Sequence, residues 1–224
     1  MLRAFLFDFD GTIADTEPLH FAAFAEVLGR RGIELSEATY YERYLSLTDR
    51  ECLELALADA ERRDLAGEIP ALLREKAQAM AGRLAADVPL CPGVEGFLVE
   101  ASTIGPLGIV SGALRREACG VLERAGLSRY FAAVVTAEDV TAGKPDPEGY
   151  RLGWRRLRRE LADLEPPECL AIEDSPKGVE AARAAGLATL AIPHTRPASE
   201  LALADVVAPS YAAIDWRALR ARFG

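Results

Sequence analysis

The sequence predicts an α/β fold, a Rossmann-like parallel sheet with helices on both faces, and two observations lead to this prediction. Short apolar runs bounded by turn residues recur along the chain, and helical patterns separate several of them. Such alternation is typical of parallel sheets, whose ligands bind beyond the carboxyl ends of the strands. The expected strands are residues 4–7, 107–110, 133–135, 170–172 and 189–192.

The segment between the first two expected strands is rich in helix-forming residues. Helical patterns run over residues 19–31, 49–64 and 69–84. Residues 88–93, with two prolines and a glycine, have the composition of a linker that returns to the sheet. We therefore predict a core domain of residues 1–16 and 88–224 and a helical domain of residues 17–87, inserted after the first strand. The alternative is that these helices simply cover the sheet.

The composition is that of a globular chain, with 224 residues, 50% hydrophobic and 27% charged. The formal net charge of -9 argues against a nucleic-acid partner, because an acidic surface repels phosphates. We interpret the one basic block as the solvated face of a helix. It comprises Arg155, Arg156, Arg158 and Arg159.

The cysteines indicate neither a zinc site nor a disulfide framework. They are scattered, form no Cys-x-x-Cys pair and have no histidine nearby, so we expect reduced thiols. These residues are Cys52, Cys91, Cys119 and Cys169. The start of the chain leaves no room for a signal peptide before Asp8, and no apolar stretch approaches membrane-spanning length. We expect a cytoplasmic protein with no membrane partner, either a monomer or a small homo-oligomer.

The most informative residues follow the first expected strand. Residues 5–12 read Phe-Leu-Phe-Asp-Phe-Asp-Gly-Thr, so Asp8 and Asp10 would lie on the same side of a strand as the chain turns. Two neighbouring anions repel unless a cation joins them, and Mg²⁺ prefers oxygen ligands and keeps waters that phosphates can replace. The pattern predicts a metal-assisted site for a phosphorylated substrate. The alternative is a buried strand followed by a solvated acidic turn.

Two later segments offer groups for a phosphate. Ser111 and Gly112 follow the second strand and could bind phosphate oxygens, or Ser111 could cap a helix over residues 113–124. Lys144 stands between a glycine and a proline, which restricts its backbone and could direct its ammonium toward an anion. The alternative is an exposed turn lysine. Asp146 could hold Lys144 in place or cap the helix that follows.

The fourth expected strand delivers two more acids, Glu173 and Asp174, to a turn. Adjacent residues on a regular strand point to opposite faces, so both acids can approach one metal only if the chain bends there. Ser175 and the proline after it supply such a bend. The alternative is that Asp174 or Ser175 caps a helix over residues 179–185.

Together these motifs, Asp-x-Asp-Gly-Thr, Ser-Gly, Gly-Lys-Pro and Glu-Asp-Ser-x-x-Gly, occur in the order and approximate spacing of the haloacid dehalogenase-like (HAD) hydrolases. The chain resembles this family over nearly its whole length. The inserted segment has the position and length of the family's type C1 helical cap. Among its members, the chain is most similar to the phosphoglycolate phosphatase-like and β-phosphoglucomutase-like (CbbY-type) groups.

The resemblance implies a covalent mechanism. Asp8 would be the nucleophile that forms an aspartyl-phosphate, and Asp10 would act as general acid and then as general base. Ser111 and Lys144 would bind the transferring phosphoryl oxygens, with Thr12 and Gly112 as further substrate-binding residues.

The resemblance also implies a Mg²⁺ site. The Asp8 and Asp174 carboxylates and the Asp10 backbone carbonyl would hold the ion, and Glu173 would orient its waters or contribute a ligand.

The cap of these enzymes selects the substrate and excludes water, so we expect polar cap residues to contact an anionic substrate. The candidates are His20, Arg50 and Lys76. His20 could equally be a core histidine, and Arg50 and Lys76 could be surface charges.

The leading interpretation is a Mg²⁺-dependent phosphomonoesterase that acts on a small phosphorylated metabolite. A phosphosugar mutase is the first alternative. His20 and Lys76 stand where mutase-like members have such residues, whereas Asp49 falls where their cap loop would show an arginine, and this departure favours hydrolysis. Dehalogenation is disfavoured, because that branch lacks an acid equivalent to Asp10 and needs no metal. A non-catalytic phosphate-binding regulatory protein is the alternative from another class.

Overall fold

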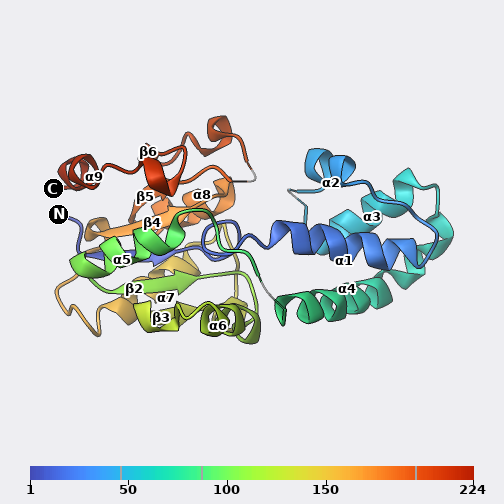
Figure 1. Cartoon of the computed structure of the whole chain (residues 1–224), viewed down its shortest axis with the longest axis horizontal. Coiled ribbons are helices and arrows are strands. Elements are labelled where there is room, and N and C mark those ends of the chain that lie inside the picture. Colours follow the sequence, from blue (N-terminus) through green and yellow to red (C-terminus); the bar gives the residue numbers. More distant parts are fainter. Residues whose placement is uncertain (46, 87, 195) are drawn as a thin grey trace. The chain divides into compact units, whose positions relative to one another are not determined.

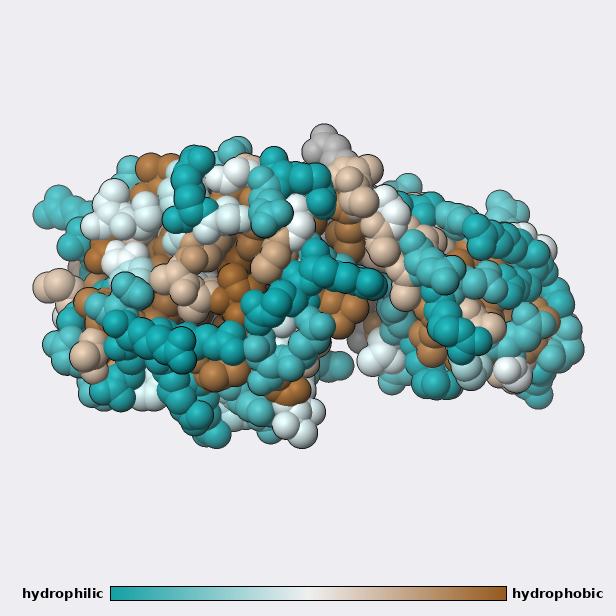
Figure 2. Space-filling model, turned by 90° about the horizontal axis from the view of Figure 1, so that it is seen from below, coloured by the Kyte–Doolittle hydropathy of each residue, from teal (hydrophilic) through white to brown (hydrophobic). Residues whose placement is uncertain are grey.

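The computed structural model describes residues 1–45, 47–86, 88–194 and 196–224. They form two compact units, Met1–Asp15 with Pro89–Gly224, and Thr16–Val88 (Figure 1). Residue 87, the predicted end of the inserted domain, lies outside the described residues. On the face drawn in Figure 2, hydrophilic side chains cover much of the surface of each unit, with apolar side chains visible among them.

A parallel sheet of six strands within the described residues forms the centre of the first unit, in the order β3-β2-β1-β4-β5-β6. Its strands are β1 (Ala4–Phe7), β2 (Leu107–Val110), β3 (Phe131–Val135), β4 (Cys169–Glu173), β5 (Ala188–Ala191) and β6 (Val206–Val207). The five predicted strands are confirmed, with ends shifted by up to two residues. Strand β6 was not predicted, because two residues carry no readable alternation. The first strand, β1, lies between β2 and β4, so the residues that follow it reach the middle of the sheet edge.

Helices cover both faces of this sheet. They are α5 (Val94–Ile104), α6 (Arg115–Arg124), α7 (Glu148–Leu157), α8 (Pro176–Ala184) and α9 (Trp216–Arg222). Short 3-10 helices connect them, η2 (Ser128–Tyr130), η3 (Ala137–Asp139), η4 (Pro166–Glu168), η5 (Ala198–Leu201) and η6 (Tyr211–Ala213). Side chains of β1 alternate between the faces, since Leu6 joins the cluster under α7 and α8, whereas Phe5 and Phe7 contact Trp216 of α9 and Phe97 of α5.

Three local expectations differ from the structure. Helix α6 begins at Arg115 rather than at residue 113, and α8 begins at Pro176 rather than at residue 179. The basic block is only partly a solvated helix face, because α7 ends at Leu157 and the Arg156 guanidinium is bonded to Asp139 at 2.7 Å.

The second unit consists of helices α1 (Glu17–Gly29), α2 (Glu37–Arg43), α3 (Asp49–Asp59) and α4 (Ile69–Leu84), with the 3-10 helix η1 (Arg63–Glu68). Residues 49–64 do not form one helix, because Glu61 adopts a φ of 55° and ends the helical path. The short α2 was not predicted. An apolar cluster from these helices gives the unit its own core. No helix in the described parts of the chain has the length and apolar character needed to cross a membrane.

Candidate active site

The carboxyl ends of β1, β2 and β4 bring the predicted core residues to one edge of the sheet. Asp8 follows β1, and its backbone N–H donates to the Ile172 carbonyl of β4 at 2.9 Å. Ser111 follows β2, and Glu173 ends β4. The topology alone therefore gathers groups that lie more than a hundred residues apart.

Three buried carboxylates form the centre of the site. Asp8, Glu173 and Asp174 each offer an oxygen, and these oxygens lie within 4.8 Å of one another. Adjacent acids share this point because the chain leaves the strand geometry after Glu173. Ser175 then caps α8, with its hydroxyl accepting from the Gly178 N–H at 3.1 Å. The cap of α8 is thus Ser175, which leaves the Asp174 carboxylate in the acidic cluster.

Lys144 supplies positive charge to this cluster. Its ammonium donates to the Asp8 carboxylate and, at 2.6 Å, to Glu173 Oε1. The interpretation of Lys144 as an exposed turn lysine is therefore wrong. Asp146 does not hold Lys144. It accepts a hydrogen bond from the Glu148 N–H at 2.9 Å, at the start of α7.

The Glu173 carboxylate is fully buried and engaged on both oxygens. Oε1 accepts from the Tyr150 hydroxyl at 2.6 Å as well as from Lys144, and Oε2 accepts from the Ser175 hydroxyl at 3.0 Å. A Cβ at Gly178 would lie 1.9 Å from Oε1, so only glycine leaves room for this carboxylate. Glu173 is thereby placed to hold Lys144.

Gly11 brings the turn after β1 against the same cluster. It has a φ of +74°, and a Cβ there would lie 2.1 Å from Asp174 Oδ2. The close approach sets Asp10 beside the acids, and the negative charge of Asp10 raises the pKa of both Asp8 and Asp174.

The charges of the cluster do not balance. Burial raises the pKa of Asp8 to about 7, with Glu173 and Asp10 also raising it and Lys144 lowering it. Burial, Asp8 and Glu173 hold the pKa of Asp174 well above its usual range. Burial lowers the pKa of Lys144, but its attraction to Asp8 and Glu173 outweighs this and raises it. One ammonium thus faces several carboxylates. The remaining negative charge is carried by oxygen atoms, which are the ligands that a divalent cation such as Mg²⁺ prefers.

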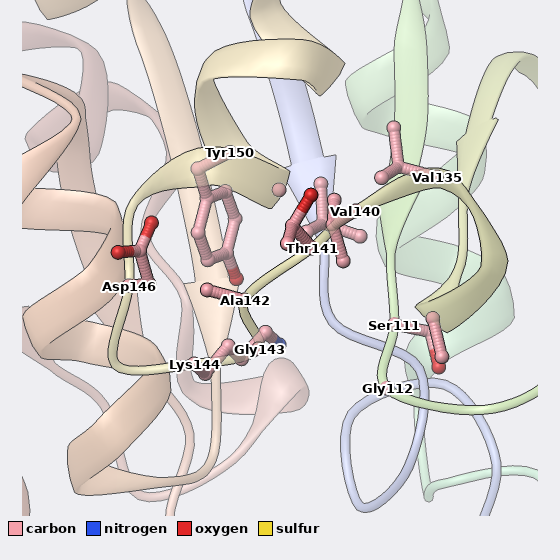
Figure 3. A pocket seen from close by; sticks show the side chains of 13 residues that line it. Ser111, Gly112, Val135, Val140, Thr141, Ala142, Gly143, Lys144, Asp146 and Tyr150 are labelled. Carbon is pink, nitrogen blue, oxygen red and sulfur yellow. The ribbon is translucent and has the colours of Figure 1, made fainter.

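A cavity of about 180 Å³ opens beside the cluster. Figure 3 shows Ser111 and Gly112 on one side of it and Lys144 on another. The Ser111 hydroxyl accepts from the Ala113 N–H at 2.9 Å, so it caps this turn, although α6 itself begins after Leu114. Gly112 is exposed.

Thr12 is fully buried, and its hydroxyl has no hydrogen-bond partner among the described residues. The roles of Ser111, Gly112 and Thr12 in binding a substrate stay predictions.

Two of the three cap candidates, His20 and Lys76, lie together in the helical unit. Lys76 is 2% exposed, so its interpretation as a surface charge is wrong. Its ammonium donates to both Asp49 carboxylate oxygens at 2.8 Å and lies 2.9 Å from His20 Nδ1. Arg50 is exposed and lies 3.8 Å from Glu54. Contact of these residues with a substrate stays a prediction.

All four cysteines are free thiols, as expected. Sequence reasoning did not single out Tyr150, whose hydroxyl reaches Glu173 across 23 positions. No local pattern marks this contact, because it depends on how α7 packs on the sheet.

Comparisons with known proteins agree with this geometry. The family described as haloacid dehalogenase-like hydrolase matches residues 2–186. The fructose-1-phosphate phosphatase YqaB of Escherichia coli is 34% identical over 184 residues, which cover 81% of this chain and 92% of that protein. The validoxylamine A 7'-phosphate phosphatase of Streptomyces hygroscopicus subsp. limoneus is 30% identical, covering 96% and 97%.

A solved structure shares the whole fold. The putative β-phosphoglucomutase from Thermotoga maritima superimposes with a TM-score of 0.77 and 28% identity, and the match covers 98% of this chain and 99% of that one. The extent of the family match, together with the acids and the lysine gathered at the sheet edge, leads to one conclusion. This chain belongs to the haloacid dehalogenase-like hydrolases.

Proposed function

We propose that the protein is a Mg²⁺-dependent phosphatase that hydrolyses the phosphate monoester of a small sugar-like metabolite through an aspartyl-phosphate. The observation that carries this proposal is the buried cluster of Asp8, Glu173 and Asp174 with the Lys144 ammonium. The names of the two relatives support it, since both are phosphatases and one acts on fructose 1-phosphate.

In the first step an Asp8 carboxylate oxygen bonds to phosphorus while the bond from phosphorus to the substrate oxygen breaks. Asp10 gives its proton to the leaving oxygen, which departs as an alcohol. Water then attacks the phosphorus, Asp10 takes a proton from that water, and the bond to Asp8 breaks to release inorganic phosphate. Asp8 and Asp10 thus return to their starting states.

Electrostatics allow an anionic nucleophile to meet an anionic ester. Lys144 places its charge beside Asp8, and Glu173 and Tyr150 hold the groups around it. A bound Mg²⁺ would add positive charge at the phosphoryl oxygens, held by the Asp8 and Asp174 carboxylates and the Asp10 carbonyl. Ser111 is proposed to bind a phosphoryl oxygen.

The role of the helical unit as a C1 cap is part of the proposal. It is supported by the insertion of Thr16–Val88 directly after the turn that carries Asp8 and Asp10. In this role His20, Arg50 and Lys76 would contribute to the choice of substrate.

The test is a panel of sugar phosphates with Mg²⁺, assayed for phosphate release by wild type and Asp8→Asn. We expect turnover by wild type that EDTA abolishes, and a loss of at least about 1,000-fold in kcat for Asp8→Asn, because an amide cannot form the acyl phosphate. Asp163→Asn is the control, since this exposed carboxylate pairs only with surface-lying Arg3 in the described structure.

Other results would reject the proposal. Retained turnover in Asp8→Asn would exclude Asp8 as the nucleophile. Interconversion of sugar phosphate isomers after priming with a bisphosphate, without net phosphate release, would identify a mutase. No turnover with Mg²⁺ on any ester, but measurable phosphate binding, would favour a binding protein.

A further inference from the structure

A residue near the end of the chain reaches the turn that carries the proposed catalytic acids. Tyr211, in η6, is 6% exposed. Its hydroxyl donates to the backbone carbonyl of Thr12 at 2.9 Å, across 199 positions of sequence. Because Thr12 is itself fully buried, water cannot replace this hydrogen bond without opening the structure.

The Thr12 carbonyl belongs to a tight turn. The Gly11 N–H donates to the Ala14 carbonyl at 2.8 Å, and Gly11 lies so close to Asp174 that no Cβ fits between them. The peptide planes of this turn are linked in series. We therefore expect a shift of the Thr12 carbonyl to press Gly11 against Asp174 and to move Asp10 with it.

Aromatic packing fixes the position of the Tyr211 ring. Its centroid lies 5.0 Å from that of Phe97, which stacks on Trp216 at 4.6 Å and meets Phe7 at 5.8 Å. Trp216 in turn contacts Phe5 at 6.1 Å. Phe5 and Phe7 belong to β1, the strand that leads into Asp8, so the C-terminal segment is packed on the strand that delivers the nucleophile.

We propose that Tyr211 is a positioning residue for the phosphatase reaction, one that holds the turn of Asp10 in register with Asp174 through the Thr12 carbonyl. This inference rests on the proposed function. The family match ends at residue 186, so Tyr211 lies in a part of the chain that the match does not describe. Its hydroxyl is hydrogen-bonded to a backbone carbonyl of the turn, so its proposed effect on the acids is indirect.

The test compares Tyr211→Phe with wild type on an aryl phosphate in the presence of Mg²⁺. The substitution keeps the ring in its aromatic cluster and removes only the donor. We expect kcat to fall by about 10-fold and KM to change by less than about 2-fold, because the acids are displaced while groups that bind phosphate stay. Tyr130→Phe is the matched control. It removes a hydroxyl that contacts Arg129 on the surface, and kcat stays at the wild-type value.

A second variant separates positioning from general stability. Leu201→Ala removes a fully buried side chain from a separate apolar cluster with Val179 and Ala191, and it leaves the aromatic cluster of Tyr211 unchanged. We expect it to lower Tm at least as much as Tyr211→Phe, while kcat measured well below Tm falls by less than about 3-fold. Equal losses of kcat in both variants would overturn the positioning role.

The outcomes also distinguish this role from the proposed function. An active wild type with an unimpaired Tyr211→Phe variant would overturn the role of Tyr211 alone. A wild type without Mg²⁺-dependent turnover would overturn the proposed function and this role together.

Discussion

Lys144 in the sheet-containing unit and Lys76 in the helical unit are both held by carboxylates, yet their surroundings differ in charge balance. Lys144 faces Asp8 and Glu173, with Asp174 close by, and all three acids are buried. Within the described residues, Asp49 is the only carboxylate that is hydrogen-bonded to the Lys76 ammonium. The Asp49 side chain is 44% exposed. The first group has an excess of negative charge, whereas the second is a balanced pair.

Burial of a lysine therefore does not by itself identify a catalytic site. An excess of carboxylates over cations leaves buried groups with shifted pKa values, which is a feature of sites that bind cations or transfer protons. A balanced pair in which one partner reaches water has no such excess of charge, and its proposed part in the choice of substrate does not require shifted pKa values. This difference supports the proposal that the chemistry takes place at the Lys144 cluster.

The largest expected difference between the two lysines is in catalysis. Lys144→Met removes the cation beside the proposed nucleophile, and we expect kcat/KM to fall by about 100-fold to 1,000-fold. Lys76→Met leaves Asp49 able to be hydrated, and we expect a loss of less than about 10-fold. Steady-state kinetics on one sugar phosphate with Mg²⁺ would check this, and equal losses in the two variants would show that the lysines do not differ in their catalytic role.

A smaller effect is expected on stability in the helical unit. Asp49→Asn leaves the Lys76 ammonium buried beside His20 without a carboxylate, so we expect the free energy of unfolding to fall by about 1–3 kcal/mol. Asp163→Asn on the surface is the control and should change it by less than about 0.5 kcal/mol. Urea unfolding of both variants measures these values. An unchanged stability for Asp49→Asn would show that Lys76 does not depend on its partner.

Much of the fold was predictable because the signals were local. The apolar runs of β1 and β4 end directly in acids, and parallel strands bring such ends together at one edge. Three local features were not predictable, for physical reasons. Strand β6 has two residues and helix α2 has seven, which is too short for a clear periodic pattern. The helical pattern over residues 49–64 is broken at Glu61, a residue type that does not indicate a positive φ.

The candidate site was predictable in its motif residues and not in its supporting contacts. Asp8, Lys144 and Asp174 come from recognisable segments and lie together. Tyr150 and Tyr211 reach the site across 23 and 199 positions, and such contacts are decided by the packing of whole elements. The pairing of Asp49 with Lys76 spans 27 positions and is likewise decided by the packing of whole helices.

In the proposed function, a divalent cation relieves the excess negative charge at Asp8 and Asp174. Without metal, the pKa of Asp8 is raised from its ordinary value of 3.8 to about 7 in the folded chain, and that of Asp174 is raised too. Between pH 3.8 and about pH 7, Asp8 is therefore more protonated in the folded state than in the unfolded state. The stability of the metal-free protein falls as the pH rises through this range. Protons and Mg²⁺ compete for the same oxygens, so stabilisation by Mg²⁺ must grow over the same range.

The most direct measurement is the change in Tm caused by Mg²⁺ as a function of pH, for wild type and Asp174→Asn. We predict a shift near zero at about pH 5 that grows to about 5 °C or more at about pH 8 in wild type, and a much smaller shift at both pH values in the variant. A shift that is independent of pH, or that is the same in Asp174→Asn, would show that Mg²⁺ does not bind at the Asp8 and Asp174 carboxylates.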